Sequence, residues 1–594
     1  MNNKIKISLV ILFSLSLFDA IAQENDTLVA ENHNYDSILS SNDYFLDVLF
    51  YKYQNDVLIN NLGPFGSPNY YPTAFGLNGI NRFYLNSDLY HTVSELFAVK
   101  PYTNVSYINA SRKEQVISVS HYQKFGKLIR FSFDFTRLSS PGAYINQEAN
   151  NTLFDISLSY KSKLNTYGIS VSSFIDRSFL QENGGLLTPV DFENNVYSNR
   201  RSYNVNLPNS TSSNKRHEYN VNQQFKLFSL NNDTVIDNGI YLNLNTQYLN
   251  KRYVFNDTDP LSPIYTNNFI DTLATVDSIY QSDLSNMLML DLVKSNFKVG
   301  VFSKFDVITY DQKNGIDTSY NDINAGFYSC IENDKIEANL KSAYVVSGYR
   351  KADVVADLNV IYSLSKSIKL SFKSSYHLNE PNLRYVSYSS NHFEWRNNDF
   401  KKQSVFSNQL LIGFKNIRTE LSVENKMINK YVYIDSTISA RQHNNQLSIS
   451  TFRLAKDYRL LNFHFRTAVI YQLTSNEVLF PLPQFIGRQL IYYENYLFKK
   501  ALKFQIGGNV SFKSEFYGYG YMPAINEFYA QSNSQIGNYP SLDIFINTRL
   551  KRAQIYFKYE HFNAGWSGYT YYGTPGYPRL DKAFKFGVSW NMFD

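Results

Sequence analysis

The chain has 594 residues, and its 57 Lys and Arg against 51 Asp and Glu leave a net charge of +6 spread over a large protein. Nucleic-acid binding requires clustered positive charge, which this composition does not provide. The single cysteine, Cys330, excludes an internal disulfide. Aromatic residues are frequent: 49 Tyr and 45 Phe bring the aromatic fraction to 16%, and these residues favour strands and membrane–water interfaces.

Residues 1–22 have the features of a secretory signal peptide. Two lysines precede a short apolar run at residues 7–18, and Ala20 and Ala22 form an A-x-A cleavage site. The pattern predicts export with cleavage after Ala22. A lipid anchor would require a cysteine at this point, where the chain has Gln23. No later segment is long and apolar enough for a transmembrane helix.

Residues 23–101 are polar and irregular. A Gly/Pro cluster with the sequence LGPFGSP occupies residues 62–68, and prolines at this density exclude a central strand or a long helix. We interpret residues 23–101 as an N-terminal segment that is either periplasmic or plug-like.

From residue 102 onward, apolar and polar residues alternate. At residues 130–135, three phenylalanines alternate with Arg130, Ser132 and Asp134. The same period recurs at residues 154–161, 167–172, 368–373, 502–513 and 583–592. A period of two is typical of a strand with one apolar face, and about ten such residues cross a bilayer when the strand is tilted.

The last strand of the chain is strongly aromatic on one face, which suits contact with lipid. Its Gly587, Trp590, Met592 and Phe593 resemble the C-terminal assembly signal of outer-membrane proteins. The chain departs from that signal in ending on Asp594 instead of an aromatic residue.

The links between the predicted strands alternate between long and short when they are counted back from the C-terminus. Links 562–581, 516–539 and 251–283 are long, whereas 551–552, 498–501 and 455–459 are short. Long extracellular loops and short periplasmic turns are typical of outer-membrane barrels. We therefore predict an all-β protein in which residues 102–594 form a transmembrane antiparallel β-barrel of about 18–22 strands, with 22 as our count.

The alternation also assigns charged residues and Cys330 to the inner face. The predicted pore-lining residues are Arg130, Asp134, Lys369, Lys373, His464, Arg466, Lys503, Lys558, Glu560 and Lys585. Cations outnumber carboxylates in this set, so we expect a weak preference for anions.

No catalytic, metal or cofactor motif is found. Gly565-Trp566-Ser567-Gly568 resembles a nucleophile elbow, but its second glycine comes one residue early. We predict that the protein is not an enzyme and needs no cofactor.

Two predicted outer loops, 516–529 and 562–578, are rich in Tyr and Gly. Their aromatic rings could stack on sugars or other flat ligands. The alternative, which we favour, is that the rings pack over the barrel mouth or belong to the aromatic girdle.

The chain resembles the Bacteroidetes-type putative porins. The resemblance rests on LGPFGSP at 62–68, on KPYT at 100–103 with RKEQ at 112–115, on ENGG at 182–185, and on the C-terminal strand. It covers the whole mature chain and implies a location in the Gram-negative outer membrane and a pore-like role. The family has no functional residues to transfer.

The function that we expect is that of a porin, a water-filled channel for passive diffusion of small hydrophilic solutes. A gated or plugged receptor-transporter and a structural or secretion-associated barrel stay open as alternatives. Expected partners are outer-membrane lipid, the barrel-assembly machinery and the transported solutes, without nucleic acid. The sequence leaves open whether the protein forms a homo-oligomer.

Overall fold

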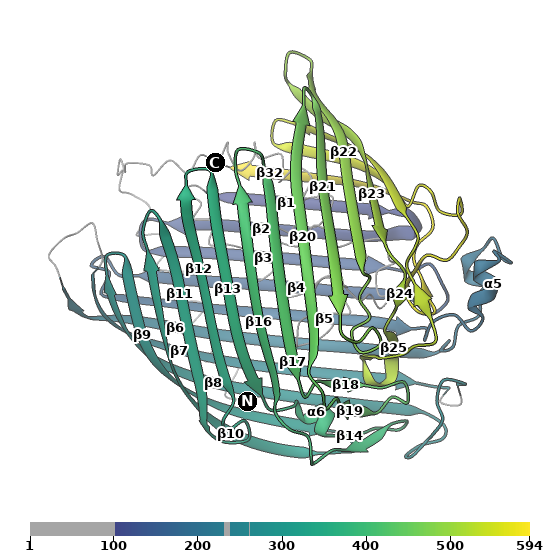
Figure 1. The fold of residues 1–594 in the computed structure, drawn as a ribbon, viewed down its shortest axis with the longest axis horizontal. Coiled ribbons are helices and arrows are strands. Elements are labelled where there is room, and N and C mark those ends of the chain that lie inside the picture. Colours follow the sequence, from purple (N-terminus) through teal and green to yellow (C-terminus); the bar gives the residue numbers. More distant parts are fainter. Residues whose placement is uncertain (1–100, 231–237, 260–261, 594) are drawn as a thin grey trace, which may run out of the picture.

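A computed structural model describes residues 101–230, 238–259 and 262–593, which form a 22-stranded antiparallel β-barrel (Figure 1). Each barrel strand pairs with its predecessor in the chain, and the last strand pairs with the first, with Tyr102 opposite Phe593. Closure removes the unpaired edges that an open sheet would expose. The predicted fold class is confirmed, and the number of strands equals the count from the sequence.

The barrel strands differ in length, and β6, β7 and β8 are the longest at 19 or 20 residues, well beyond the 9–11 or so that a bilayer crossing requires. The barrel strands are β1 (Tyr102–Ala110), β2 (Glu114–Phe125), β3 (Ile129–Ser140), β4 (Ala149–Lys161), β5 (Tyr167–Glu182), β6 (Ser210–Ser229), β7 (Gly239–Asp257), β8 (Thr275–Lys294), β9 (Phe297–Gln312), β10 (Asp317–Glu332), β11 (Ile336–Ser347), β12 (Val354–Ser365), β13 (Ile368–Asn379), β16 (Gln403–Phe414), β17 (Thr419–Asn429), β20 (Leu447–Leu460), β21 (Phe463–Thr474), β22 (Phe485–Leu497), β23 (Leu502–Lys513), β28 (Ser541–Leu550), β29 (Ala553–Glu560) and β32 (Ala583–Phe593).

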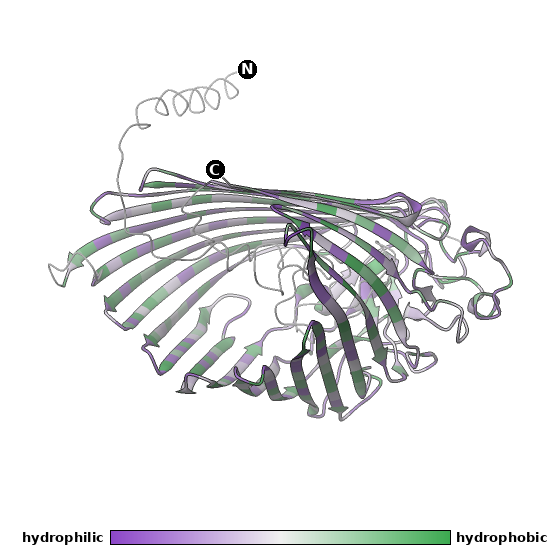
Figure 2. Cartoon of the chain, turned by 90° about the horizontal axis from the view of Figure 1, so that it is seen from above, coloured by the Kyte–Doolittle hydropathy of each residue, from purple (hydrophilic) through white to green (hydrophobic). Residues whose placement is uncertain are grey.

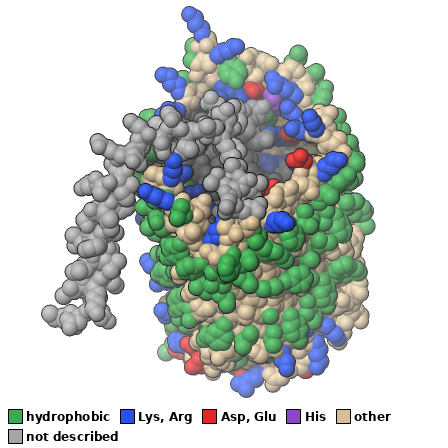
Figure 3. Space-filling model, turned by 90° about the vertical axis from the view of Figure 1, so that its left-hand side faces the viewer, with side chains coloured by type: hydrophobic (Ala, Val, Ile, Leu, Met, Phe, Trp, Pro, Cys, Tyr) green, Lys and Arg blue, Asp and Glu red, His purple; other side chains and the backbone are tan. Residues whose placement is uncertain are grey.

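Alternation along each strand gives the wall two chemically different faces. On β32, Phe584, Trp590 and Met592 are between 41% and 53% exposed on the outside, whereas Lys585 and Asn591 are no more than 7% exposed on the inside. Hydrophilic and hydrophobic residues alternate along the strands in Figure 2, and apolar side chains cover much of the outer wall in Figure 3. The outer face therefore suits lipid, and the inner face suits water.

The two ends of the barrel differ in the length of their links. At the short-turn end the links include 295–296, 461–462 and 551–552, whereas at the long-loop end they include 183–209 and 514–540. The alternation of link length that the sequence predicted is present for most links, and the exceptions at the long-loop end are the short links 111–113, 313–316 and 348–353.

Several predicted link positions were wrong. The turn expected at 455–459 lies at 461–462, because β20 continues to Leu460. The link expected at 251–283 is only 258–274, because β7 and β8 are 19 and 20 residues long. The links 313–316 and 430–446 were not predicted. The second of these carries the short strands β18 and β19, whose pattern is hard to distinguish from that of a barrel strand.

The long loops contain small elements of their own, which gather at the right and lower side of the barrel in Figure 1. One further short element, η1 (Ser111–Lys113), lies in the β1–β2 link. The elements of the long loops are α5 (Pro189–Glu193), η2 (Arg200–Ser202), α6 (Leu383–Val386), β14 (Ser387–Ser389), β15 (Glu394–Arg396), β18 (Val432–Ile434), β19 (Ala440–Gln442), β24 (Phe516–Tyr517), β25 (Gly520–Met522), η3 (Pro523–Ile525), β26 (Glu527–Tyr529), β27 (Gln535–Ile536), β30 (Tyr572–Thr574) and β31 (Tyr577–Pro578).

The predicted signal peptide, its cleavage site after Ala22 and the N-terminal segment up to residue 100 lie outside the described residues. Within the described ranges, no helix has the length and apolar character needed to cross a membrane.

The two faces of β3 give a direct test of the orientation of the wall. Phe133→Lys places a charge on the lipid-facing side and should cost about 2–4 kcal/mol near the midplane, whereas Ser132→Lys places it in the interior and should cost less than about 1 kcal/mol. Unfolding in urea after reconstitution measures both variants. Equal losses at the two positions would show that the assignment of faces is wrong.

Candidate functional site

The interior of the barrel contains networks of buried charge. On the wall formed by β9, β10 and the β11–β12 link, Arg350 binds Asp322 at 2.5 Å and Asp306 at 3.2 Å, and Lys304 binds Asp306 at 2.7 Å. Both carboxylates are buried. Buried carboxylates require such partners, because removing an ion from water is costly unless an opposite charge or hydrogen bonds replace the lost hydration.

A second network joins the last strands of the barrel. Lys558 lies between Asp543 at 3.2 Å and Glu560 at 2.9 Å, and Lys585 binds Glu560 at 2.9 Å. All four side chains are buried. These lysines are held against the wall by carboxylates, so they contribute little net charge to the water in the lumen.

A third part of the wall has lysines of a different kind. Lys341 on β11 and Lys369 and Lys373 on β13 are exposed, and the described residues provide none of them with a hydrogen bond or an ion pair. Lys341 and Lys373 line an interior cavity of about 610 Å³ together with Cys330 and the His377–Asp357 pair. Unpaired positive charge in the lumen is therefore concentrated on β11–β13.

The ten predicted pore-lining residues all lie on the face of the sheet opposite the exposed apolar residues, which is the inner face. Several have partners that the sequence did not predict. Lys503 binds Glu494 at 3.1 Å, Arg466 lies 3.6 Å from Asp457, and His464 stacks on a neighbouring tyrosine. Their role in lining an open pore stays a prediction.

The inner face carries more carboxylates than the alternation of the sequence indicated. Besides Asp134 and Glu560, which were expected there, it holds Asp291, Asp306, Asp322, Asp357 and Glu494. These residues lie on strands whose alternation is interrupted by inward apolar residues, so their orientation is not evident from the pattern alone. The interior is mixed in charge.

Glycines on the inner face allow tyrosine rings to lie against the wall. A Cβ atom at Gly587 on β32 would overlap the ring of Tyr556 on β29, and one at Gly300 on β9 would lie 2.7 Å from the ring of Tyr328 on β10. Covering a strand glycine with an aromatic ring from the neighbouring strand protects its backbone and fixes the register. Gly587, predicted as part of an assembly signal, therefore also has a packing role.

At the long-loop end, the loops fold together into a structure that we call the loop cap. It comprises the described residues of links 141–148, 183–209, 258–274, 380–402, 430–446, 475–484, 514–540 and 561–582. Three clusters of buried apolar residues lie within the cap and against the adjoining strand ends, and each draws side chains from several loops. The loops therefore share hydrophobic cores.

Polar contacts also connect loops that are far apart in the sequence. Arg200 from the β5–β6 loop binds Asp581 from the β29–β32 loop through Nε at 2.7 Å and Nη2 at 3.2 Å. The same guanidinium lies 4.8 Å from the ring centroid of Phe192 and 4.9 Å from that of Tyr569. Arg384 and Glu527 form a further pair between loops at 3.0 Å. Bidentate and stacked arginines are geometrically specific contacts, which favours one arrangement of the cap.

The Tyr/Gly-rich loops belong to this cap. Tyr519, Tyr521, Phe528 and Tyr571 are buried within its clusters, so their rings are covered by protein and are not free to stack on a ligand. Trp566 is an exception, with 64% of its surface exposed. The structure agrees with the packing alternative that we favoured.

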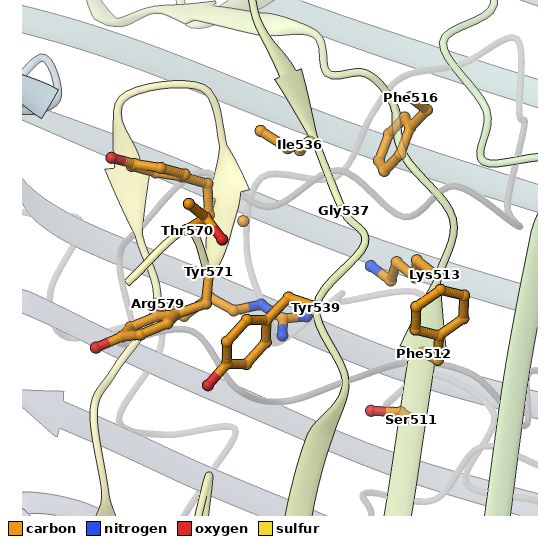
Figure 4. Close-up of a pocket in the computed structure, with 12 residues that line it drawn as sticks. Ser511, Phe512, Lys513, Phe516, Ile536, Gly537, Tyr539, Thr570, Tyr571 and Arg579 are labelled. Atoms are coloured by element: carbon orange, nitrogen blue, oxygen red, sulfur yellow. The ribbon is translucent and has the colours of Figure 1, made fainter. Parts of the chain in front are cut away.

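A small cavity of about 30 Å³ lies where β23 meets the cap, and Lys513 and Arg579 point into the same space (Figure 4). Its volume corresponds to about one water molecule, which is too small for a solute. Among the described residues, no cluster of three or more His, Cys, Asp or Glu could hold a metal ion.

A family model described as "Putative porin" matches residues 77–594, which is most of the sequence. The chain belongs to the putative porin family. Membership in this family, together with the closed barrel, indicates an outer-membrane protein with a role in transport. No protein in a comparison with curated proteins matches the chain.

Solved structures with similar folds include an iron transporter and two receptors. The FrpB iron transporter of Neisseria meningitidis has a TM-score of 0.58 at 10% identity, covering 83% of this chain and 82% of the other. The ferric enterobactin receptor of Pseudomonas aeruginosa has a TM-score of 0.57 at 10% identity, covering 83% and 81%. The siderophore receptor PirA of Acinetobacter baumannii has 0.57 at 9%, covering 83% and 80%. At these identities, the likeness of this family member to the three structures is one of fold.

The packing of Gly587 can be tested against a matched glycine. Gly587→Ala should displace the ring of Tyr556 and destabilise the barrel by about 1–3 kcal/mol, a typical cost of overpacking. Gly413→Ala is the control, because its Cβ would have no neighbour nearer than a backbone oxygen at 3.9 Å. The denaturation midpoint of the purified proteins measures the effect. Equal stability of the two variants would argue against the packing role.

One element of the cap predicts a dependence on pH. His392 is buried, its Nδ1 lies 2.9 Å from the carbonyl of Asn267, and its Nε2 lies 2.8 Å from the hydroxyl of Thr275. Burial lowers the pKa of His392, although the hydrogen bond to Asn267 opposes the shift. The unfolded loop then binds a proton more readily than the folded loop. The stabilising contribution of neutral His392 is thus complete above the ordinary histidine pKa of about 6.5 and declines below it.

We therefore expect amide exchange in residues 262–274 to accelerate as the pH falls from about 7.5 to about 5, after correction for the intrinsic rate. The His392→Gln variant should lose this dependence. Hydrogen–deuterium exchange of the full protein measures both. An identical pH response in the variant would assign the effect to other groups.

Proposed function

We propose that the protein is an outer-membrane porin that allows passive diffusion of small hydrophilic solutes. The observation that carries this proposal is the polar inner face of a closed 22-stranded wall, with its charged side chains and a cavity of about 610 Å³. Closed barrels of this size have a lumen wide enough for water or for a plug. We further propose that the chain is exported and cleaved after Ala22, with its short turns in the periplasm and its loop cap outside the cell.

The loop cap supports a restricted pore. Shared apolar cores and the contacts Arg200–Asp581 and Arg384–Glu527 hold the loops in one arrangement at the outer end. In this proposal the cap excludes large solutes, and the charges of the inner wall then select among the small solutes that pass.

Charge selectivity in this proposal depends on few residues. Most inner cations face carboxylates at salt-bridge distance, whereas Lys341, Lys369 and Lys373 are exposed to the lumen. A fixed charge in a narrow aqueous path raises the local concentration of counter-ions. We therefore retain a weak anion preference as a proposal, and we assign it to the wall formed by β11–β13.

A gated or plugged receptor-transporter is the second candidate. The observation that favours it is the likeness of the barrel to an iron transporter, with a TM-score of 0.58, and to a siderophore receptor, with a TM-score of 0.53. A structural or secretion-associated barrel is a third, less supported reading. Assembly in each case would use the barrel-assembly machinery, for which Gly587, Trp590, Met592 and Phe593 are the proposed signal.

Single-channel recording in a planar bilayer distinguishes these candidates. A porin should give steady openings without an added ligand, and its reversal potential in a salt gradient should indicate weak anion preference. Silence in the full-length protein, with large openings after deletion of residues 23–101, would favour the plugged transporter. Silence in both forms would favour the structural or secretion role.

The same recording tests the assignment of selectivity. The double variant Lys341→Gln, Lys373→Gln should shift the reversal potential toward cations, because it removes unpaired positive charge from the cavity. The control is Lys582→Gln, an exposed lysine in the β29–β32 loop. A shift of the same size in the control would show that the ion selectivity does not depend on the wall formed by β11–β13.

A further inference from the structure

The short-turn end of the barrel has many exposed lysines without partners. We call six of them the basic collar: Lys163, Lys366, Lys415, Lys499, Lys500 and Lys551. They come from five different turns, all are exposed, and the described residues provide none of their side chains with a hydrogen bond or an ion pair. The collar therefore presents positive charge around the rim and not from a single patch.

Some cations of the loop cap are arranged differently. Arg200, Arg384 and Arg441 are each held by a carboxylate from the loops, at 2.7 Å, 3.0 Å and 3.1 Å. Other cations at the long-loop end, such as Lys351, Lys401 and Lys582, are exposed as they are in the collar. The distinctive feature of the short-turn end is therefore the combination of its exposed lysines with large exposed apolar residues.

Large apolar residues accompany the basic collar at the tips of the turns. Leu164 directly follows Lys163, Ile417 lies two residues after Lys415, and Phe498 directly precedes Lys499. Leu461 at the β20–β21 turn is 83% exposed, and Phe498 is 75% exposed. We call Leu164, Ile417, Leu461 and Phe498 the apolar tips. Exposed apolar residues at the strand ends adjoin two of them, with Leu460 directly before Leu461 and Leu497 directly before Phe498.

Two of the apolar tips occupy a strained backbone conformation. Leu461 has a φ of 53° and Phe498 has a φ of 51°, in the left-handed region where glycine and asparagine are the usual residues. A bulky apolar residue at such a position is unfavourable both for the backbone and for its contact with water. Positive φ also occurs at Lys499, Lys500 and Lys551, so this conformation is a property of the tight turns. An apolar environment would explain why two of these positions are occupied by leucine and phenylalanine.

We propose that the short-turn end of the barrel binds a leaflet that contains anionic phospholipid. The basic collar contacts the phosphates of the headgroups, and the apolar tips enter the boundary between headgroups and acyl chains. Two features favour lipid over a protein partner: the positive charge is distributed around the rim, and two of the apolar tips directly follow exposed apolar residues at the strand ends. Basic residues beside apolar anchors are typical of segments that bind anionic membranes.

The proposal is independent of the transported solute, and it can be tested with the full mature chain in a non-ionic detergent. Native mass spectrometry, with added phosphatidylglycerol or phosphatidylcholine, measures how many lipids remain bound. We expect the wild type to retain several-fold more phosphatidylglycerol at low salt, and we expect this preference to fall as salt screens the charges. Equal retention of the two lipids would overturn the proposal and leave an acidic soluble protein as the alternative partner.

Matched triple variants locate the effect. Lys499→Gln, Lys500→Gln, Lys551→Gln should reduce the preference for phosphatidylglycerol by about half or more, since it removes three of the six collar lysines. The control, Lys351→Gln, Lys401→Gln, Lys582→Gln, removes three exposed lysines from the long-loop end and should leave the preference unchanged. An equal loss in the control would show that the lipid preference follows the net charge of the protein, and it would overturn the proposed role of the collar.

The apolar tips have a variant of their own that preserves the turns. Leu461→Asn, Phe498→Asn places a residue that tolerates positive φ at both positions, so folding in detergent should be retained or improved. We expect the variant to retain fewer lipids of both kinds while its thermal stability in detergent does not fall. Unchanged lipid retention would exclude the apolar tips from the contact.

Discussion

The structure depends on one constraint: in hydrocarbon, every backbone N–H and C=O group must find a partner within the protein. A sheet satisfies this only when it closes, which it does here by pairing β1 with β32 along the whole of β1. Closure then determines three further features of the structure. Side chains of each strand must alternate between lipid and lumen, both chain ends of the barrel lie at the same end, and loops are confined to the two rims.

That confinement explains why the loop cap has cores of its own. The barrel holds the ends of the long loops near one another, so the entropy cost of bringing distant segments together has already been met by the wall. Apolar residues such as Phe192 and Phe480 then become buried between loops and not within the barrel. Arg200 and Asp581 are 381 positions apart in the chain, and they meet only because β5 ends and β32 begins on the same rim.

The sequence predicted those features that depend on local pattern. A period of two identified the strands and their faces, and the alternation of link length identified the two ends, because both follow directly from the closed wall. It did not predict the pairing of Arg350 with Asp306 and Asp322, or the contact of Tyr556 with Gly587. These depend on register between strands, which parity alone does not specify. The loop clusters were likewise inaccessible, because they join segments hundreds of residues apart.

The distribution of charge follows from the difference between the surfaces that the barrel presents. Lys558 is buried, and a buried cation is stable only beside carboxylates such as Asp543 and Glu560. Lys341 and Lys373 line a cavity and are exposed, so they do not need such a partner. The charges that act on a solute are therefore few, even though the inner face has many. Counting charged residues on that face overestimates the field in the lumen, because each buried pair cancels most of its own contribution at the distance of a passing ion.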